Sequence, residues 1–145
     1  MSKKILILNG PNLNLLHKRD KEIYGDASLA TIEQDCKVLA TTLGVEIVFK
    51  QSNNEGHLVD FIQDAVDNFD GIIINAAAYT HTSVAIRDAL EMFHKPKIEL
   101  HISNIFKREE FRQNSFLSDV VTAVISGLGV DGYTISLLAM NNLIK

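Results

Sequence analysis

The sequence predicts an α/β fold in which a five-stranded parallel sheet carries helices on both of its faces. Short apolar, β-branched runs alternate along the chain with segments of helical periodicity, and this alternation is typical of βαβ units. The apolar runs are continuous, as expected of parallel strands that are buried on both sides. The chain has 145 residues, of which 46% are hydrophobic and 22% are charged. That composition fits a globular domain and excludes disorder, collagen-like repeats and coiled coils.

Five strands are expected along the chain, at residues 5–8, 45–49, 71–74, 97–100 and 120–126. Helices are expected where apolar residues recur every three or four positions, at 29–43, 58–69, 84–93 and about 130–143. No linker, repeat or low-complexity segment interrupts this order. Residues 1–145 are therefore expected to form a single flavodoxin-like domain, a three-layer sandwich of helices, sheet and helices.

Charge and hydropathy exclude two classes of partner. Lysine and arginine total 14 against 18 aspartates and glutamates, so the chain lacks the overall basic character of a nucleic-acid-binding protein. No apolar run approaches the ~20 residues of a membrane span. The chain has 1 cysteine, which cannot form an intrachain disulfide, and its N-terminal residues resemble no cleavable signal. We therefore expect a cytoplasmic protein without nucleic-acid or membrane partners.

Polar side chains follow the predicted strands at the edge where a ligand would bind. In open parallel sheets, ligands bind outside the carboxyl ends of the strands, at the point where the strand order reverses. Loops at that edge are expected at 9–14, 51–56, 75–83 and 101–112, and they carry amides, hydroxyls, imidazoles and guanidiniums. Such groups suit a polyhydroxylated, anionic small molecule.

The motifs of several other ligands are missing. The loop after the first strand has neither the GxxxxGK[ST] nor the GxGxxG pattern that binds nucleotides. Asn75 stands where phospho-acceptor domains of the same layout need an aspartate. The 5 histidines show no metal-ligand spacing, so no metal is expected, and Cys36 on an apolar helix face is interpreted as a buried structural thiol. Two alternatives to an enzyme stay open: a binding module for a small polyol acid, and a flavin or phosphoryl-signalling domain.

Several candidate residues have a structural interpretation beside a functional one. The charged segment 17–26 is either a solvated loop or a mobile lid that carries a guanidinium and a phenol over the strand edge. His101 is either a histidine satisfied at a strand end or a catalyst. Arg108 and Arg112 could simply pair with Glu109 and Glu110. Each signal is weak alone, and the functional interpretation depends on their joint placement.

Long strings of the sequence resemble type II 3-dehydroquinate dehydratase. They are ILILNGPNLNLL at 5–16, IYG at 23–25 with Arg19 before it, QSN and EG within 51–56, AYTHTSVAIRDAL at 78–90, ELHISNI at 99–105 and REEFR at 108–112. The resemblance runs from residue 4 to about 127–133, nearly the whole chain. It implies dehydration of 3-dehydroquinate to 3-dehydroshikimate in the shikimate pathway, by anti elimination through an enolate and without a cofactor or metal.

The resemblance also implies the catalytic roles of the matching residues. Tyr24 would be the base that removes a proton from C2 of the substrate, and Arg19 would favour its phenolate form. His101, oriented by Glu99, would give a proton to the departing C1 hydroxyl. Asn12 would help to hold the water or oxygen at the enolate. A tyrosine of ordinary pKa near 10 is only ~0.1% phenolate at pH 7, so a nearby cation is what such a base needs.

The implied substrate contacts come from the later loops. Ring hydroxyls would be held by Asn75, His81 and Arg112, and the carboxylate by the backbone amides of Ile102 and Ser103. Asp88 would reach the site from a neighbouring subunit, because the family assembles as homododecamers built from trimers.

The sequence departs from the family pattern at positions His17, Asp20, Lys21, Asn54, Ala76, Ala77 and Phe106. None of these is a proposed catalytic group. They bear on the stiffness of the lid and on the fit of the substrate.

Overall fold

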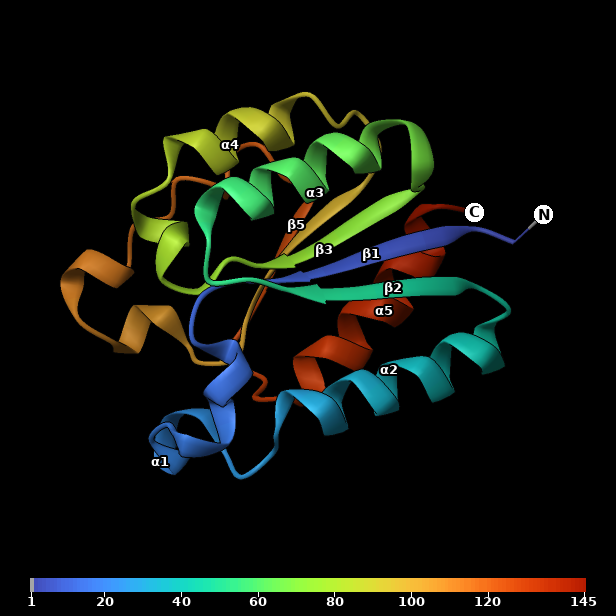
Figure 1. Ribbon diagram of the computed structural model, residues 1–145. Helices are drawn as coiled ribbons and strands as arrows, with labels where there is room; N and C mark the ends of the chain where they lie inside the picture. The colour runs from blue at the N-terminus through green and yellow to red at the C-terminus, as the bar shows by residue number, and fades with distance from the viewer. Residues whose placement is uncertain (1) are drawn as a thin grey trace.

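The fold is built on a parallel sheet of 5 strands in the order β2-β1-β3-β4-β5 (Figure 1). This structure is a computed structural model that describes residues 2–145. The strands are β1 (Lys4–Asn9), β2 (Glu46–Gln51), β3 (Gly71–Asn75), β4 (Lys97–His101) and β5 (Ala123–Ser126). Each neighbouring pair runs parallel. The predicted α/β, flavodoxin-like class is confirmed.

Helices cover both faces of this sheet, and short helices lie at the carboxyl ends of its strands. On one face lie α2 (Leu29–Leu43) and α5 (Asp131–Leu143), and on the other lie α3 (Glu55–Asn68) and α4 (Val84–Glu91) (Figure 1). The short elements are α1 (Lys21–Tyr24), η1 (Leu13–Lys18), η2 (Ala77–His81), η3 (Ile105–Lys107) and η4 (Glu110–Arg112). They follow β1, β3 and β4 at the carboxyl ends of the strands, and Figure 1 shows both chain termini at the opposite edge.

Alternate side chains of β1 point into two hydrophobic layers. Ile5 and Ile7 pack with α2 and α5, whereas Leu6 and Leu8 pack with α3 and α4. A strand between two such layers needs apolar side chains on both sides, which explains its continuous apolar run. Glu99 lies in the middle of β4 and is a completely buried charged residue inside this sheet.

Local hydrogen bonds determine where the long helices begin. The side chains of Ser28, Asn54 and Ser83 accept from the backbone N–H groups that open α2, α3 and α4. Such caps satisfy donors that the first helical turn cannot pair internally. The cap at Asn54 explains why α3 begins at Glu55, ahead of the apolar periodicity that predicted it.

The last strand is shorter than predicted. It begins at Ala123, because Val120 and Val121 pack instead against the layer formed by α3 and α4. The N–H of Thr122 then donates to the carbonyl of Lys97 at 2.8 Å, where the chain enters the sheet. Phe69 and Phe93, expected inside helices, lie buried just beyond the ends of α3 and α4. Apolar periodicity cannot distinguish a buried turn residue from a buried residue of the adjoining element.

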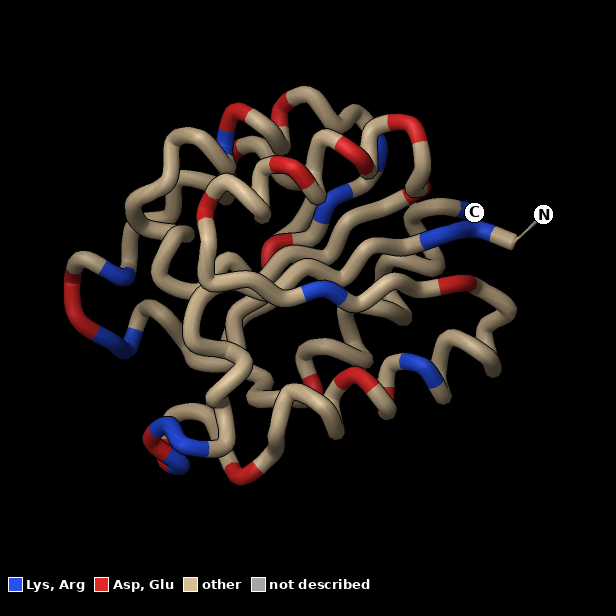
Figure 2. The backbone as a smooth tube through the Cα atoms, viewed as in Figure 1, with Lys and Arg blue, Asp and Glu red and all other residues tan. Residues whose placement is uncertain are grey.

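Charged residues gather on the outer helices and on two loops at the carboxyl edge of the sheet, 17–26 and 107–112 (Figure 2). Within residues 2–145, no helix combines the length and the apolar character needed to cross a membrane.

The strand order reverses between β1 and β3, and the loops after these two strands are in close contact. The N–H of Gly10 donates to the carbonyl of Asn75 at 2.8 Å. A Cβ atom at Gly10 would lie 2.4 Å from the carbonyl oxygen of Ala76, so only glycine allows this approach. The candidate site opens beside this contact.

Candidate active site

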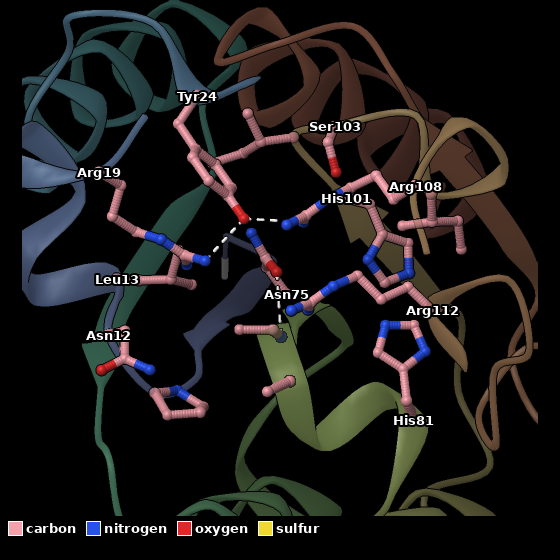
Figure 3. A pocket seen from close by; sticks show the side chains of 15 residues that line it. Asn12, Leu13, Arg19, Tyr24, Asn75, His81, His101, Ser103, Arg108 and Arg112 are labelled. Atoms are coloured by element: carbon pink, nitrogen blue, oxygen red, sulfur yellow. Dashed lines mark hydrogen bonds between the residues drawn. The ribbon is translucent and has the colours of Figure 1, made fainter. Parts of the chain in front are cut away.

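A polar cavity of about 130 Å³ lies at the carboxyl ends of β1, β3 and β4 (Figure 3). Most residues predicted for the site line it: Asn12, Arg19, Tyr24, Asn75, His81, His101, Ile102, Ser103 and Arg112. Glu99 lies behind His101, and Asp88 lies elsewhere. The topology therefore brings segments from positions 12 to 112 of the chain around one small space.

Tyr24 presents its hydroxyl to two arginines. The phenol oxygen accepts from Nη2 of Arg19 at 2.7 Å and from Nη1 of Arg108 at 2.7 Å. The guanidinium carbon of Arg19 also lies 4.0 Å from the centroid of the tyrosine ring. Tyr24 is only 7% exposed, so water screens these interactions little. Two cations on one buried oxygen stabilise negative charge there.

Arg108 was a candidate to which the sequence assigned no role in the site. The sequence placed it in a charged segment where pairing with Glu109 or Glu110 was an adequate explanation. Its Nε does lie 3.8 Å from an oxygen of Glu109, but its Nη1 binds Tyr24, 84 residues away in the chain. The sequence signals were its place in the loop after the fourth strand and in the REEFR string.

The segment that carries Tyr24 is held in a short helix. Asp20 accepts from the N–H of Glu22 at the start of α1, and Gly25 ends that helix with a positive φ of 75°. Tyr24 is therefore turned inward, while Lys21 and Glu22 stay exposed. The solvated-loop interpretation holds for those outer residues and not for the phenol.

His101 and Glu99 form a buried pair on β4. Nε2 of His101 hydrogen-bonds to Oε2 of Glu99, and the two side chains are 5% and 0% exposed. Burial raises the pKa of Glu99, but hydrogen bonds from His101, Ser118 and Ser115, together with the charge of His101, bring it below its usual value. An ionised carboxylate only accepts hydrogen bonds, so Nε2 carries a proton and Nδ1 is available to a ligand.

His81 lies against His101 at the other wall of the cavity. Their ring centroids are 6.3 Å apart and the planes differ by 21°. Nδ1 of His81 donates to the carbonyl of Asn114 at 2.9 Å, which leaves Nε2 as an acceptor. Burial lowers the pKa of His81, and the neighbouring His101 and Arg112 lower it further, against the opposing effect of the Asn114 carbonyl. His81 is thus a neutral group suited to hydroxyls.

Asn75 is the last residue of β3, and hydrogen bonds hold both the nitrogen and the oxygen of its side-chain amide. Its Nδ2 donates to the hydroxyl of Tyr133 at 3.0 Å, and its Oδ1 accepts from the N–H of Ala77 at 3.2 Å. The Tyr133 hydroxyl in turn donates to Oδ1 of Asn9 at 2.7 Å. Burial raises the pKa of Tyr133, which keeps it a neutral donor. This chain of contacts, which crosses from α5 to two strand ends, was not predicted.

The backbone after β4 has a fixed orientation, because two of its carbonyls accept hydrogen bonds from the loop between β5 and α5. The carbonyl of His101 accepts from the N–H of Gly127, and the carbonyl of Ile102 accepts from the N–H of Gly129. In a trans peptide the C=O and N–H groups point in opposite directions. The N–H groups of Ile102 and Ser103 therefore point away from the loop between β5 and α5, and both residues line the cavity.

Asn12 lies at the mouth of the cavity in a left-handed conformation with φ of 71°. Its N–H donates to Oδ1 of Asn53 at 2.9 Å, and the side chain of Gln51 donates to the carbonyl of Gly10 at 3.1 Å. The QSN string, which begins at the last residue of β2, thus supports the loop after β1. Arg112 lines the opposite wall, where its Nε is 3.1 Å from Oε2 of Glu109.

Asp88 is a predicted residue that neither lines this chain's own cavity nor hydrogen-bonds to a residue that does so in the described structure. It lies exposed on α4. Within residues 2–145, no group of three or more His, Cys, Asp or Glu side chains is arranged to hold a metal ion.

Known proteins match nearly the whole chain. A model of the family described as "Dehydroquinase class II" matches residues 3–141. A 3-dehydroquinate dehydratase of Bartonella henselae is 58% identical over 137 residues, covering 94% of this chain and 93% of that protein. The crystal structure of a type II dehydroquinase from Butyrivibrio crossotus matches with a TM-score of 0.94 and 44% identity, over 97% of this chain and 98% of that one. The corresponding structure from Propionibacterium acnes has a TM-score of 0.94, 40% identity and 98% coverage of both chains. This chain therefore belongs to the class II dehydroquinase family.

Proposed function

We propose that residues 1–145 form one catalytic domain that dehydrates 3-dehydroquinate to 3-dehydroshikimate in the shikimate pathway, with Tyr24 as base and His101 as acid. Family membership supports the overall reaction. The observation that carries the assignment of residues is the pair of guanidiniums, from Arg19 and Arg108, that donate to one buried tyrosine hydroxyl. Two cationic donors on one oxygen stabilise the negative charge that a tyrosine must carry to remove a C–H proton.

In the first step, the Tyr24 phenolate takes a proton from C2. The electron pair of the C–H bond moves toward C3, and the product is an enolate with its negative charge on the C3 oxygen. Asn12 holds that oxygen directly or through a water molecule. Arg19 and Arg108 stay on the tyrosine, so the base returns to its starting state when the proton leaves.

In the second step, the bond between C1 and its hydroxyl breaks. His101 gives a proton to the departing oxygen, which leaves as water. The electron pair of the enolate forms the C1=C2 double bond, and the C3 carbonyl is restored. The carboxylate of Glu99 supports this step because its hydrogen bond to Nε2 orients the imidazole and leaves Nδ1 free to face the substrate.

The remaining groups bind and orient the substrate. The amides of Ile102 and Ser103 take the carboxylate, which an array of backbone donors suits. Asn75, His81 and Arg112 bind the ring hydroxyls. The support for these contacts is that all five residues line the same cavity as Tyr24 and His101.

We extend the proposal to the assembly. Asp88 is exposed on α4 and away from its own cavity, so its proposed role requires a neighbouring subunit, in a homododecamer built from trimers. Light scattering combined with activity measurements tests this point. A fully active monomer would contradict it.

The test of the function is a direct assay of the purified protein with 3-dehydroquinate, following the absorbance of the enone product. Activity is expected to survive a chelator, and also borohydride added with substrate, because neither a metal nor a Schiff base takes part. A protein that binds the substrate but forms no enone would be a binding module instead.

A further inference from the structure

The segment 114–119 is part of the connection between η4 and β5. It contacts His81 and also Glu99, the partner of His101. Asn114 accepts from His81, as described above. Ser115 Oγ donates to Oε2 of Glu99 at 3.0 Å, and Ser118 Oγ donates to Oε1 of Glu99 at 2.7 Å. The proposed mechanism uses Glu99 and leaves these two serines without a role.

The two hydroxyls complete the environment of a carboxylate that water does not reach. Glu99 is 0% exposed, and its Oε2 already accepts from His101. Ser118 is the donor to Oε1, so its removal would leave a buried charged oxygen without that partner. Ser115 Oγ also accepts from the N–H of Leu117 at 3.0 Å, an interaction that turns its own hydrogen toward Glu99.

The segment is fastened to two helices, α4 and η2, of which η2 lines the site. Arg87 on α4 donates to the carbonyl of Phe116 at 2.8 Å and pairs with both carboxylate oxygens of Asp119. The N–H of Phe116 donates to the carbonyl of Thr80 on η2 at 2.9 Å. The serine hydroxyls are therefore presented to Glu99 by a braced backbone.

The charged groups around His101 show which of them acts on its imidazole ring. The other titratable groups that face it are His81 on η2, Arg112 on η4, and Arg19, Tyr24 and Arg108 across the cavity. Among these groups and Glu99, only the carboxylate of Glu99 places a negative charge in contact with the imidazole.

We propose that Ser115 and Ser118 are positioning residues that keep Glu99 ionised and directed at His101, so that His101 is a proton donor when the C1 hydroxyl departs. This inference rests on the proposed role of His101 as the acid. The hydroxyls touch no substrate and act through Glu99 alone.

The first test observes Glu99 directly. Infrared titration follows the carbonyl stretch of its protonated carboxyl, which is assigned by its absence in Glu99→Gln. In Ser118→Ala we expect the protonation midpoint of Glu99 to rise by about one pH unit or more, the effect of losing a hydrogen bond to a charged group. Ser115→Ala should raise it as well, and Ser118→Thr, which keeps the hydroxyl, should restore it.

Asp119→Asn is the matched control, because it loosens the same segment without touching Glu99. Its midpoint should equal that of the wild type. An unchanged midpoint in both alanine variants would overturn the proposal, as would an equal rise in Asp119→Asn.

The second test separates the two chemical steps. In Ser118→Ala, product formation should fall while Tyr24 still exchanges the C2 proton, so that the ratio of solvent-deuterium exchange to dehydration rises. Damage to the whole site would lower both rates together and would overturn the inference. If wild-type protein neither exchanges nor dehydrates the substrate, the proposed function fails, whereas the infrared titration of Glu99 is unaffected by that outcome.

Discussion

Replacing Arg108 by methionine is expected to reduce kcat by about one to two orders of magnitude, with a smaller change in KM. The substitution keeps most of the side-chain length and removes the donor that lies 2.7 Å from the Tyr24 hydroxyl. A hydrogen bond to a charged group contributes about 1.5–3 kcal/mol, and each 1.36 kcal/mol is a factor of ten in rate. Because Tyr24 is only 7% exposed, solvent cannot replace the lost donor effectively.

The same estimate applies to Arg19, whose Nη2 is also 2.7 Å from the phenol oxygen. Arg19→Met with Arg108→Met should therefore cost about two to four orders of magnitude in total, and approach the loss expected of Tyr24→Phe. Lys107→Met is the matched control, because it removes a positive charge from the neighbouring exposed position. That variant should keep the wild-type rate.

The assay is kcat at pH 7, together with exchange of the C2 proton with solvent. In Arg108→Met the rate of C2 exchange should fall together with kcat, because the lost donor acts on the step that removes this proton. His101→Ala should lower turnover while C2 exchange persists. Wild-type kcat at pH 7 in Arg108→Met would refute the reasoning, and so would wild-type C2 exchange in Tyr24→Phe.

Three further changes test the surroundings of the site. Tyr133→Phe should raise KM and lower the unfolding free energy in urea by about 1–3 kcal/mol, because buried amide groups of Asn75 and Asn9 lose their partner; an unchanged KM would argue against its role in orienting Asn75. Ala77 has a φ of 51°, so Ala77→Gly should raise the unfolding free energy by about 0.5 kcal/mol, and a loss of stability would contradict this account of strain. Burial raises the pKa of Glu99, but hydrogen bonds bring it below its usual value. Ionisation of Glu99 therefore stabilises the fold at any pH above the unfolded-state pKa of about 4.3. This stabilisation is lost as the pH falls through the folded-state pKa. The stability difference between wild type and Glu99→Gln should therefore shrink in acid, and a difference independent of pH would exclude this origin.

Much of the fold was predictable because its determinants are local. Continuous apolar runs indicated strands buried on both faces, and spacing of three or four indicated helices. The error at the start of β5 arose where Val120 and Val121 have the composition of a strand but pack beside the sheet. Whether these two valines join the strand or pack beside the sheet depends on the neighbouring helices, and not on the apolar run to which the valines belong.

The candidate site was predictable to the extent that its residues follow strands or belong to family-like strings. Tyr24 and His101 were named in this way. Ser115, Ser118 and Tyr133 were not, because serine or tyrosine in a loop or helix carries no distinctive pattern. Their importance arises from what they contact, Glu99 in one case and Asn75 in the other.

The sequence by itself determined the class of fold, the succession of strands and helices along the chain, the family, and the side chains available for the chemistry. These depend on periodicity, capping residues and strings of adjacent residues, all of which are readable in one dimension. Only the tertiary structure decided that Arg108 shares the Tyr24 hydroxyl with Arg19, and that two serines surround Glu99. Such contacts join residues 5 to 84 positions apart, and they exist because parallel strands bring their carboxyl ends to one edge, where burial strengthens every interaction between charges.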